Sequence, residues 1–234
     1  MIVRGAIGLP LLLLLPAASP ARAQVAGTVA VVTDERFRAR SVSSGQPTVT
    51  ADISYDHESG LYVGGGAAVS LGDLEPRIIN LRGNVGFAHR LGSGDVLDLG
   101  VIRSKYTEHF SGGRETHYTE FYAGVLTKNV AFYAYYSPDY FRPGVSTLYL
   151  EANGVVTLSP DWRATGNVGL LTRLTEPGPP GGNRLGYDWR LGVNRTLGRA
   201  ELGLAISGGG PSAEFYRGSR RSRTAVTASL AWSL

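Results

Sequence analysis

The sequence predicts an all-β protein: a transmembrane, antiparallel up-and-down β-barrel of about twelve strands, preceded by a cleaved signal peptide. Three observations lead to this prediction. The N-terminus has the pattern of an export signal, the remaining chain alternates apolar and polar residues with a period of two, and the connections between segments are short and long in turn. The composition agrees, because 43% hydrophobic and 18% charged residues exclude a disordered chain.

Residues 1–23 have the three parts of a secretory signal peptide. Arg4 supplies a positive N-terminal region, an uncharged run follows over residues 5–21, and Ala21-Arg22-Ala23 places small side chains where a signal peptidase cleaves. Pro10 and Pro16 interrupt the apolar run, which falls short of the ~20 residues of a transmembrane helix. We therefore expect residues 24–234 to form the mature protein, a single outer-membrane barrel domain.

Alternation of apolar and polar side chains is clearest near the start of the mature chain. Val49, Ala51, Ile53 and Tyr55 are separated by threonine, aspartate and serine residues. Because successive side chains of a strand point to opposite faces, this pattern predicts a ribbon with one apolar and one polar face. The contrast is weakest in the third and seventh of the strands that we predict. The twelve predicted strands are 25–38, 47–57, 60–71, 77–90, 95–107, 115–127, 129–137, 145–158, 162–174, 184–196, 200–208 and 222–234.

Two classes of protein contain such ribbons. A soluble sandwich or barrel turns the apolar faces inward, whereas an outer-membrane barrel turns them toward lipid. Strand length favours the membrane, because ~9–11 tilted residues cross a bilayer and ~5–6 are usual in soluble sheets. A closed barrel is then required, since hydrocarbon tolerates no unpaired sheet edge, so strand one must pair with strand twelve.

The connections favour the membrane barrel most strongly. The second, fourth, sixth, eighth and tenth are tight, as in Leu91-Gly92-Ser93-Gly94. Short periplasmic turns opposite longer outer loops are typical of an outer-membrane barrel that begins and ends in the periplasm. The longer connections are 41–46, 72–76, 108–114, 138–144, 175–183 and 209–221.

The polar face predicts the lining of a lumen. Acidic and basic side chains are mixed along it, as in a wet interior where charges find partners. Barrels of about eight strands are filled by their own side chains, and barrels of about sixteen strands leave an open channel. A barrel of twelve strands is intermediate, so we expect a narrow lumen that selects solutes by charge and size. The predicted lumen-lining residues are Asp52, Arg82, Asp98, Glu120, Tyr122, Glu151, Arg163, Arg173, Asp188, Arg190 and Glu201.

Aromatic residues on the apolar face are expected at the two membrane–water interfaces, where amphipathic rings are favoured. Packing in a protein core is the alternative, but it gives no reason for the rings to share one height. The predicted inner girdle is Tyr55, Phe87, Trp162 and Trp232, and the predicted outer girdle is Tyr187 and Trp189.

Five short segments, taken in order, resemble the TorF family of bacterial outer-membrane porins (Gcw_chp), formerly of unknown function. They are VTDERFR at 32–38, ISYDHESGLY at 53–62, TEFYAGV at 119–125, YYSPDYF at 135–141 and YDWRLGV at 187–193. These segments span nearly the whole mature chain. The resemblance implies an outer-membrane barrel with transport activity and no assigned substrate.

Other classes of function have less support. The absence of cysteine excludes a disulfide scaffold, a thiolate zinc site and a cysteine nucleophile. No spacing among the four histidines fixes a base against a nucleophile, so we expect no enzyme, and we expect no metal site and no cofactor. Lysine occurs only at positions 105 and 128 and the arginines are spread along the chain, which argues against nucleic-acid binding.

We therefore expect a porin-like channel in the bacterial outer membrane, through which small polar solutes diffuse passively. Its partners would be membrane lipid, lipopolysaccharide and the solutes, with assembly into a homo-oligomer left open. The alternative is a closed structural or surface-binding barrel whose lumen charges pair and block passage. The arginines that would bind lipopolysaccharide phosphates from the last outer loop are Arg217, Arg220, Arg221 and Arg223.

Overall fold

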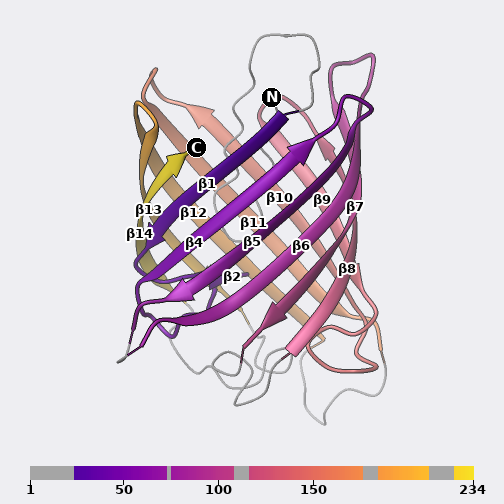
Figure 1. The fold of residues 1–234 in the computed structure, drawn as a ribbon. Helices are drawn as coiled ribbons and strands as arrows, with labels where there is room; N and C mark the ends of the chain where they lie inside the picture. Colours follow the sequence, from indigo (N-terminus) through magenta and orange to yellow (C-terminus); the bar gives the residue numbers. More distant parts are fainter. Residues whose placement is uncertain (1–23, 73–74, 108–115, 176–183, 211–223) are drawn as a thin grey trace.

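The computed structural model describes residues 24–72, 75–107, 116–175, 184–210 and 224–234, and these form a closed antiparallel barrel (Figure 1). Twelve described strands follow one another around the barrel in chain order, which confirms the predicted fold class. A separate two-stranded sheet comprises β2 (Arg36–Phe37) and β3 (Arg40–Ser41). The barrel strands are β1 (Gln24–Val32), β4 (Thr48–Asp56), β5 (Leu61–Ser70), β6 (Arg77–Arg90), β7 (Val96–Tyr106), β8 (Thr116–Leu126), β9 (Val130–Ser137), β10 (Thr147–Thr157), β11 (Trp162–Arg173), β12 (Leu185–Leu197), β13 (Ala200–Gly209) and β14 (Ala225–Ser233).

The first and last strands close the barrel. β1 pairs with β14 in an antiparallel register that runs from Thr28 opposite Ser233 to Val32 opposite Ser229. The Leu234 amide extends this seam by donating to the Gly27 carbonyl at 3.0 Å. Because β1 also pairs with β4 along its whole length, neither edge of the sheet stays open. Such closure is what a sheet surrounded by hydrocarbon needs.

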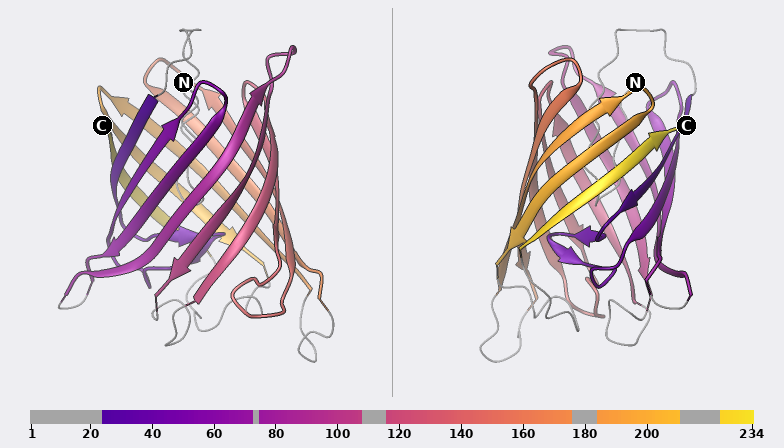
Figure 2. Two further views of the ribbon diagram at one scale, coloured as in Figure 1. Left: turned by 45° about the vertical axis from the view of Figure 1, so that its right-hand side comes forward. Right: turned by 90° about the vertical axis from the view of Figure 1, so that its left-hand side faces the viewer.

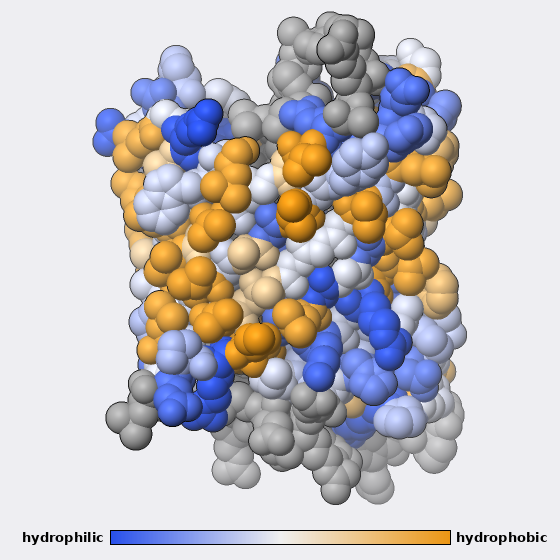
Figure 3. Space-filling model, viewed as in Figure 1, coloured by the Kyte–Doolittle hydropathy of each residue, from blue (hydrophilic) through white to orange (hydrophobic). Residues whose placement is uncertain are grey.

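The outer wall of the barrel is apolar and the inner face is polar. Large hydrophobic side chains such as Phe132, Val168 and Leu204 are exposed on the outside, whereas Asp98 and Glu120 are buried on the inside. Figure 3 shows apolar side chains gathered across one wall, with hydrophilic side chains toward its two ends. This distribution is the reverse of that in a soluble barrel and is typical of a wall in contact with lipid.

Tight turns join the strands at the end of the barrel where both termini lie (Figure 2). Gly60 and Gly94 occupy two of these turns with φ near +90°, a conformation that side chains other than glycine rarely adopt. At Gly60, an added Cβ would also lie 2.3 Å from the Ala88 carbonyl oxygen. The turn glycines therefore let the backbone reverse direction within a few residues.

The prediction for the first strand is wrong at its C-terminal end. The sequence predicts a strand over 25–38, but β1 ends at Val32 and the chain turns into the barrel. Residues 33–46, which we call the lumen hairpin, form β2 and β3 inside the wall (Figure 2). Asp34 organises this segment by accepting hydrogen bonds from Arg36, Ser41 and Ser43.

The predicted outer loop 41–46 is wrong for the same reason, since Val42 and Ser43 are buried inside the barrel. The remaining predicted strand boundaries lie within three residues of those in the structure. The two strands with weak alternation, β5 and β9, both form. The predicted signal peptide and the four loop arginines lie outside the described residues. In the described part of the chain, no helix is long and apolar enough to cross a membrane.

Matched charge substitutions on the outer wall test which medium surrounds the barrel. Val168 lies at the centre of β11 and Leu158 lies at the tight turn after β10, and both are 59% exposed. We expect Val168→Arg to lower the free energy of unfolding from lipid vesicles by ~2–4 kcal/mol, and Leu158→Arg to change it little, because the penalty falls toward the interface.

The measurement is reversible urea unfolding from vesicles. Equal and small effects at both positions would contradict a lipid-facing wall, because two equally exposed positions in water should tolerate the charge equally.

Candidate functional site in the barrel lumen

The tip of the lumen hairpin has an unusual backbone. Arg36 pairs with Ser41 and Phe37 pairs with Arg40, so Arg38 and Ala39 form a two-residue turn. Both turn residues have positive φ, 47° and 58°, where hairpins normally use glycine or asparagine. The left-handed conformation costs roughly 1–2 kcal/mol for each such residue. Contacts made by the hairpin side chains must offset this cost.

Arg38 makes those contacts with the barrel wall. Its Nη2 donates to Glu120 Oε1 on β8 at 2.8 Å, and its Nη1 donates to the Tyr140 hydroxyl at 2.7 Å. The guanidinium carbon lies 3.7 Å from the centroid of the Tyr149 ring on β10. The side chains of Arg38 and Glu120 are only 3% and 1% exposed. An ion pair buried this deeply is costly to break, because the remaining charge loses its partner.

Aromatic rings pack around this ion pair. Phe37 contacts Tyr106 of β7 and Tyr118 of β8, with ring centroids 5.8 Å and 6.4 Å apart. Tyr140 and Phe141, from the connection between β9 and β10, pack against Tyr118. The lumen hairpin and this connection thus fill the part of the lumen away from the termini.

The predicted connection at residues 138–144 is present between β9 and β10, but its Tyr140 side chain is fully buried, which the sequence does not predict. An apolar aromatic surface this large gains more by packing against Tyr118 than by exposure to water. Tyr140 and Phe141 therefore meet the lumen hairpin inside the barrel, through Arg38 and Phe37.

Tyrosine hydroxyls and carboxylates form a second cluster on the inner face. Tyr62 on β5 donates to Asp98 Oδ1 at 2.6 Å, and Tyr133 on β9 donates to Asp98 Oδ2 at 3.0 Å. The hydroxyls of Tyr62 and Tyr122 are also hydrogen-bonded to each other. This cluster fixes three rings and one acid against the wall.

Glycines make room for these rings. Tyr62 lies opposite Gly86, and Tyr122 lies opposite Gly100, on neighbouring strands. A Cβ added at Gly86 or Gly100 would come within 2.3 Å or 2.4 Å of the facing hydroxyl. The absence of a side chain at these glycines lets the tyrosines lie close to the inner wall.

Charged and amide side chains line the rest of the lumen wall and remain partly exposed. Arg163 on β11 pairs with Glu201 on β13. Arg82 on β6 pairs with Asp52 on β4 in the same way. Both pairs lie on the inner face, where their side chains are only 10–23% exposed.

Glu151 on β10 has a neutral partner. Asn167 Nδ2 on the neighbouring strand β11 donates to Glu151 Oε1 at 2.6 Å and to Asn153 Oδ1 at 2.9 Å. The amide thus satisfies one carboxylate oxygen without neutralising the acid.

The side chain of Glu35, on the lumen hairpin, is a buried carboxyl group. Burial raises the pKa of its carboxyl from the ordinary 4.5 to about 7, although the nearby charges of Arg82 and Arg190 oppose that rise. Arg190 lies on β12 opposite Ser207 of β13. The Arg190 Nε and the Ser207 hydroxyl are buried and find no hydrogen-bond partner within the described protein.

The eleven predicted lumen residues all lie on the strand face opposite the exposed apolar side chains. Asp98, Glu120, Tyr122, Arg173, Asp188 and Glu201 are buried there, and the other five are partly buried. Ion pairs join four of them to one another, Asp52 to Arg82 and Arg163 to Glu201, and Glu120 pairs with Arg38 of the hairpin. Their role in conducting a solute stays a prediction.

Five of the six predicted girdle residues are exposed on the outer face, and Trp189 is half-buried beside Gly208. Their interfacial role also stays a prediction. Sequence reasoning missed Glu35, Arg38 and Tyr140. Three consecutive charges at positions 34–36 cannot follow a period of two, and this break was the available signal for an inward turn.

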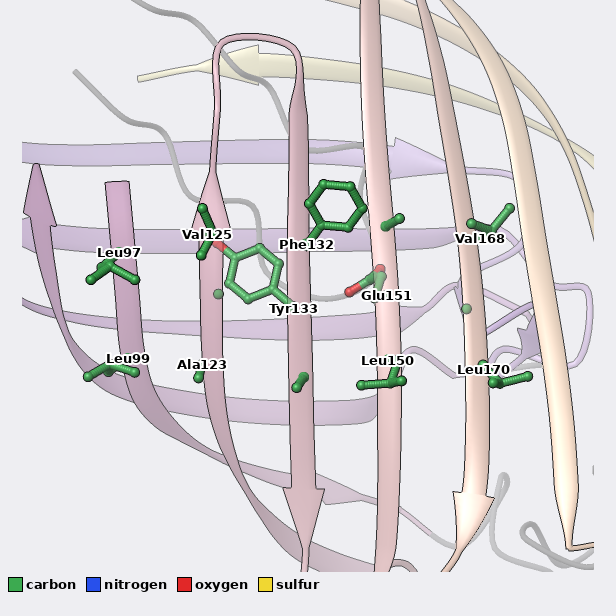
Figure 4. A pocket seen from close by; sticks show the side chains of 14 residues that line it. Leu97, Leu99, Ala123, Val125, Phe132, Tyr133, Leu150, Glu151, Val168 and Leu170 are labelled. Atoms are coloured by element: carbon green, nitrogen blue, oxygen red, sulfur yellow. The ribbon is translucent and has the colours of Figure 1, made fainter. Parts of the chain in front are cut away.

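A pocket of about 600 Å³ lies on the outer wall over β7 to β11 (Figure 4). Leu99, Ala123, Ala134, Leu150 and Leu170 follow one another across the five strands in a single row. The two short alanine side chains leave a hollow between the leucines. The lining is mainly apolar side chains of the outer wall, and Tyr133 and Glu151 of the inner face also border the pocket.

The histidines of the described ranges do not gather with acids or hydroxyls in the lumen. The histidines at positions 57, 89 and 117 are exposed, and His109 lies outside the described residues. His57 Nδ1 is 2.9 Å from the Ser59 hydroxyl within one tight turn. In the described ranges, no three His, Asp or Glu side chains gather in a way that could hold a metal ion.

Comparison with known proteins agrees with the fold. A family model described as "Bacterial protein of unknown function (Gcw_chp)" matches residues 16–234. The structure of the NanC porin is similar, with a TM-score of 0.57, 8% identity, and coverage of 90% of this chain and 100% of that one. The KdgM porin gives a TM-score of 0.54, 10% identity, and coverage of 89% and 99%. At these identities the likeness shows the fold alone. Among curated protein sequences there is no match.

The raised pKa of Glu35 predicts a pH-dependent stability. The folded protein holds this proton more tightly than the unfolded chain, whose carboxyl titrates near 4.5. The stabilising effect is therefore complete below pH 4.5 and is lost as the pH rises to about 7. We expect the melting temperature in detergent to fall over this interval, and Glu35→Gln to remove this part of the dependence.

Thermal melts of both proteins at matched ionic strength measure the difference. Parallel pH profiles for the two proteins would show that Glu35 is not the group responsible.

Proposed function

Given that the chain belongs to the Gcw_chp family of bacterial proteins of unknown function, we propose that it is a narrow porin-like channel of the outer membrane, as its TorF-family resemblance implies. Small polar solutes cross it by passive diffusion through the charged lumen. The signal peptide directs export, and the barrel domain of residues 24–234 inserts into the membrane. The protein has no catalytic role in this proposal.

The observation that carries this proposal is the contrast between the two faces of one sheet. Apolar side chains cover the outside, while partly exposed ion pairs and amides line the inside. A sheet built this way encloses a polar path within an apolar shell. Hydrogen-bonding groups such as Asn153 and Asn167 can replace part of the water shell of a small solute as it passes.

The orientation follows from the turns and termini. The end that carries the tight turns and both termini lies in the periplasm, as in other barrels of this topology. The lumen hairpin and Tyr140 then occupy the outer half of the lumen. A solute coming from outside meets this filled segment first and the partly exposed charged wall afterwards, which makes the hairpin the constriction.

A second candidate function is a closed barrel that acts as a structural or surface-binding protein. The buried Arg38–Glu120 ion pair favours it, because a hairpin anchored this firmly could block passage. In that case the lumen charges would serve stability alone. The two candidates differ in whether ions cross the folded barrel.

Planar-bilayer recording separates the candidates. We expect the wild-type protein to give small, discrete conductance steps, with a reversal potential that depends on the lumen charges. Glu151→Gln removes an acid that has amide partners, so it should lower cation preference while leaving the fold intact. Glu201→Gln, which breaks the ion pair with Arg163, serves as a control for stability effects.

A third protein, with residues 35–44 replaced by a short glycine–serine linker, tests the constriction and should conduct more than the wild type. Conductance from this variant alone would establish the closed barrel. No conductance from any folded variant would exclude a channel altogether.

A further inference from the structure

Residues of the barrel wall, together with Tyr140 from the connection between β9 and β10, surround the guanidinium of Arg38. We call this site the cation box and define it as Glu120, Tyr135, Tyr140, Tyr149 and Asp188. Glu120 and Tyr140 accept hydrogen bonds from two different nitrogens of the guanidinium. Tyr149 offers its ring face at 3.7 Å, and its hydroxyl donates to Asp188 at 3.1 Å. Flat faces and acceptors are thus arranged around a planar cation.

The box contains two acids, Glu120 and Asp188, and both are buried. Arg38 is the one described cation whose charge acts on Glu120 and on Asp188. It is also the leading cationic influence on Glu151, which lies on the same inner face two strands from Asp188, across Gly169 of β11. Arg38 thus forms an ion pair with Glu120, and its charge also acts on Asp188 of the box and on Glu151 outside it. Without Arg38, the wall would present buried acids and aromatic rings to any cation that entered.

The occupant of the box does not come from the wall that builds it. Glu120, Tyr149 and Asp188 belong to β8, β10 and β12, whereas Arg38 projects from the tip of the lumen hairpin. The hairpin holds Arg38 there through a turn with two positive φ angles and no glycine. Backbone strain that is retained at a residue indicates that the position of its side chain has a role.

We propose that the cation box is a binding site for guanidinium-type organic cations and that Arg38 is its built-in occupant. The inference deepens the proposed function, because such solutes reach the box through the lumen. It names the class of solute that the channel prefers: planar cations that donate hydrogen bonds, such as guanidinium or amidinium groups. A solute of this class competes with Arg38 and releases the hairpin from the wall.

The geometry distinguishes this class from other cations. A guanidinium group satisfies both acceptors and stacks on an aromatic ring at the same time. A quaternary ammonium ion could contact the rings but has no hydrogen to donate to Glu120 or Tyr140. Arg38 has an effective concentration on the order of millimolar or higher, so competing solutes must reach that range. Weak binding of this kind suits passive diffusion.

Chemical rescue of an Arg38→Ala variant tests the proposal. We expect this variant to melt at a lower temperature than the wild type in detergent, because Glu120 is left without its partner. Millimolar methylguanidinium chloride should restore several degrees of the loss by filling the box. Sodium chloride and tetramethylammonium chloride at equal concentration should restore little.

Arg36→Ala is the matched control, since Arg36 lies in the same hairpin and pairs with Asp34 outside the box. Methylguanidinium should not stabilise it. If Arg38→Ala fails to fold unaided, the yield of folded barrel with and without methylguanidinium gives the same readout. Rescue of both variants alike, equal rescue by all three salts, or no rescue would overturn the proposal. Because melting in detergent needs no transport, failure of the channel itself would appear separately, as missing conductance.

Discussion

Pairing of every strand edge within the sheet is the constraint on which this structure depends. The seam between β1 and β14 joins the two ends of the sheet, so that no row of backbone amides and carbonyls stays unpaired. Hydrocarbon offers no hydrogen bonds, so an open edge would cost several kcal/mol for each exposed group. Once the sheet closes on itself, the strand period of two leaves one face outside and the other inside. The apolar wall and the polar lumen both follow from that closure.

Side chains and inward-folded segments of the chain fill part of the lumen. Inward-facing tyrosines such as Tyr62 lie close to the wall where the opposite strand offers a glycine. The lumen hairpin brings Arg38 to Glu120, and Tyr140 folds in from the connection between β9 and β10. The buried Arg38 and Glu120 pair with each other, whereas Glu151 has amide neighbours on the adjacent strand. Constriction and polar path are thus two regions of the same inner face.

Much of the barrel could be predicted from sequence because its two faces differ at nearly every residue. Even β9, where Phe132 and Tyr133 give little contrast, was placed correctly by the tight turn before it. The lumen hairpin could not be predicted, because inward folding depends on contacts between positions far apart in sequence. Arg38 meets Glu120 across 82 residues, and no local pattern records that meeting. The prediction for residues 25–38 failed where three consecutive charges interrupt the alternation, since a local period says only that the strand ends and not where the chain goes next.

Tryptophan fluorescence in brominated lipid tests the central claim that the apolar face meets acyl chains. The chain has three tryptophans, of which Trp162 and Trp232 are exposed on the outer face and Trp189 is half-buried. In vesicles of lipid brominated along the acyl chain, the account predicts strong quenching of their emission and weak quenching by acrylamide in the water phase. Emission that bromine leaves unchanged and acrylamide quenches freely would contradict it, because the outer wall would then face water.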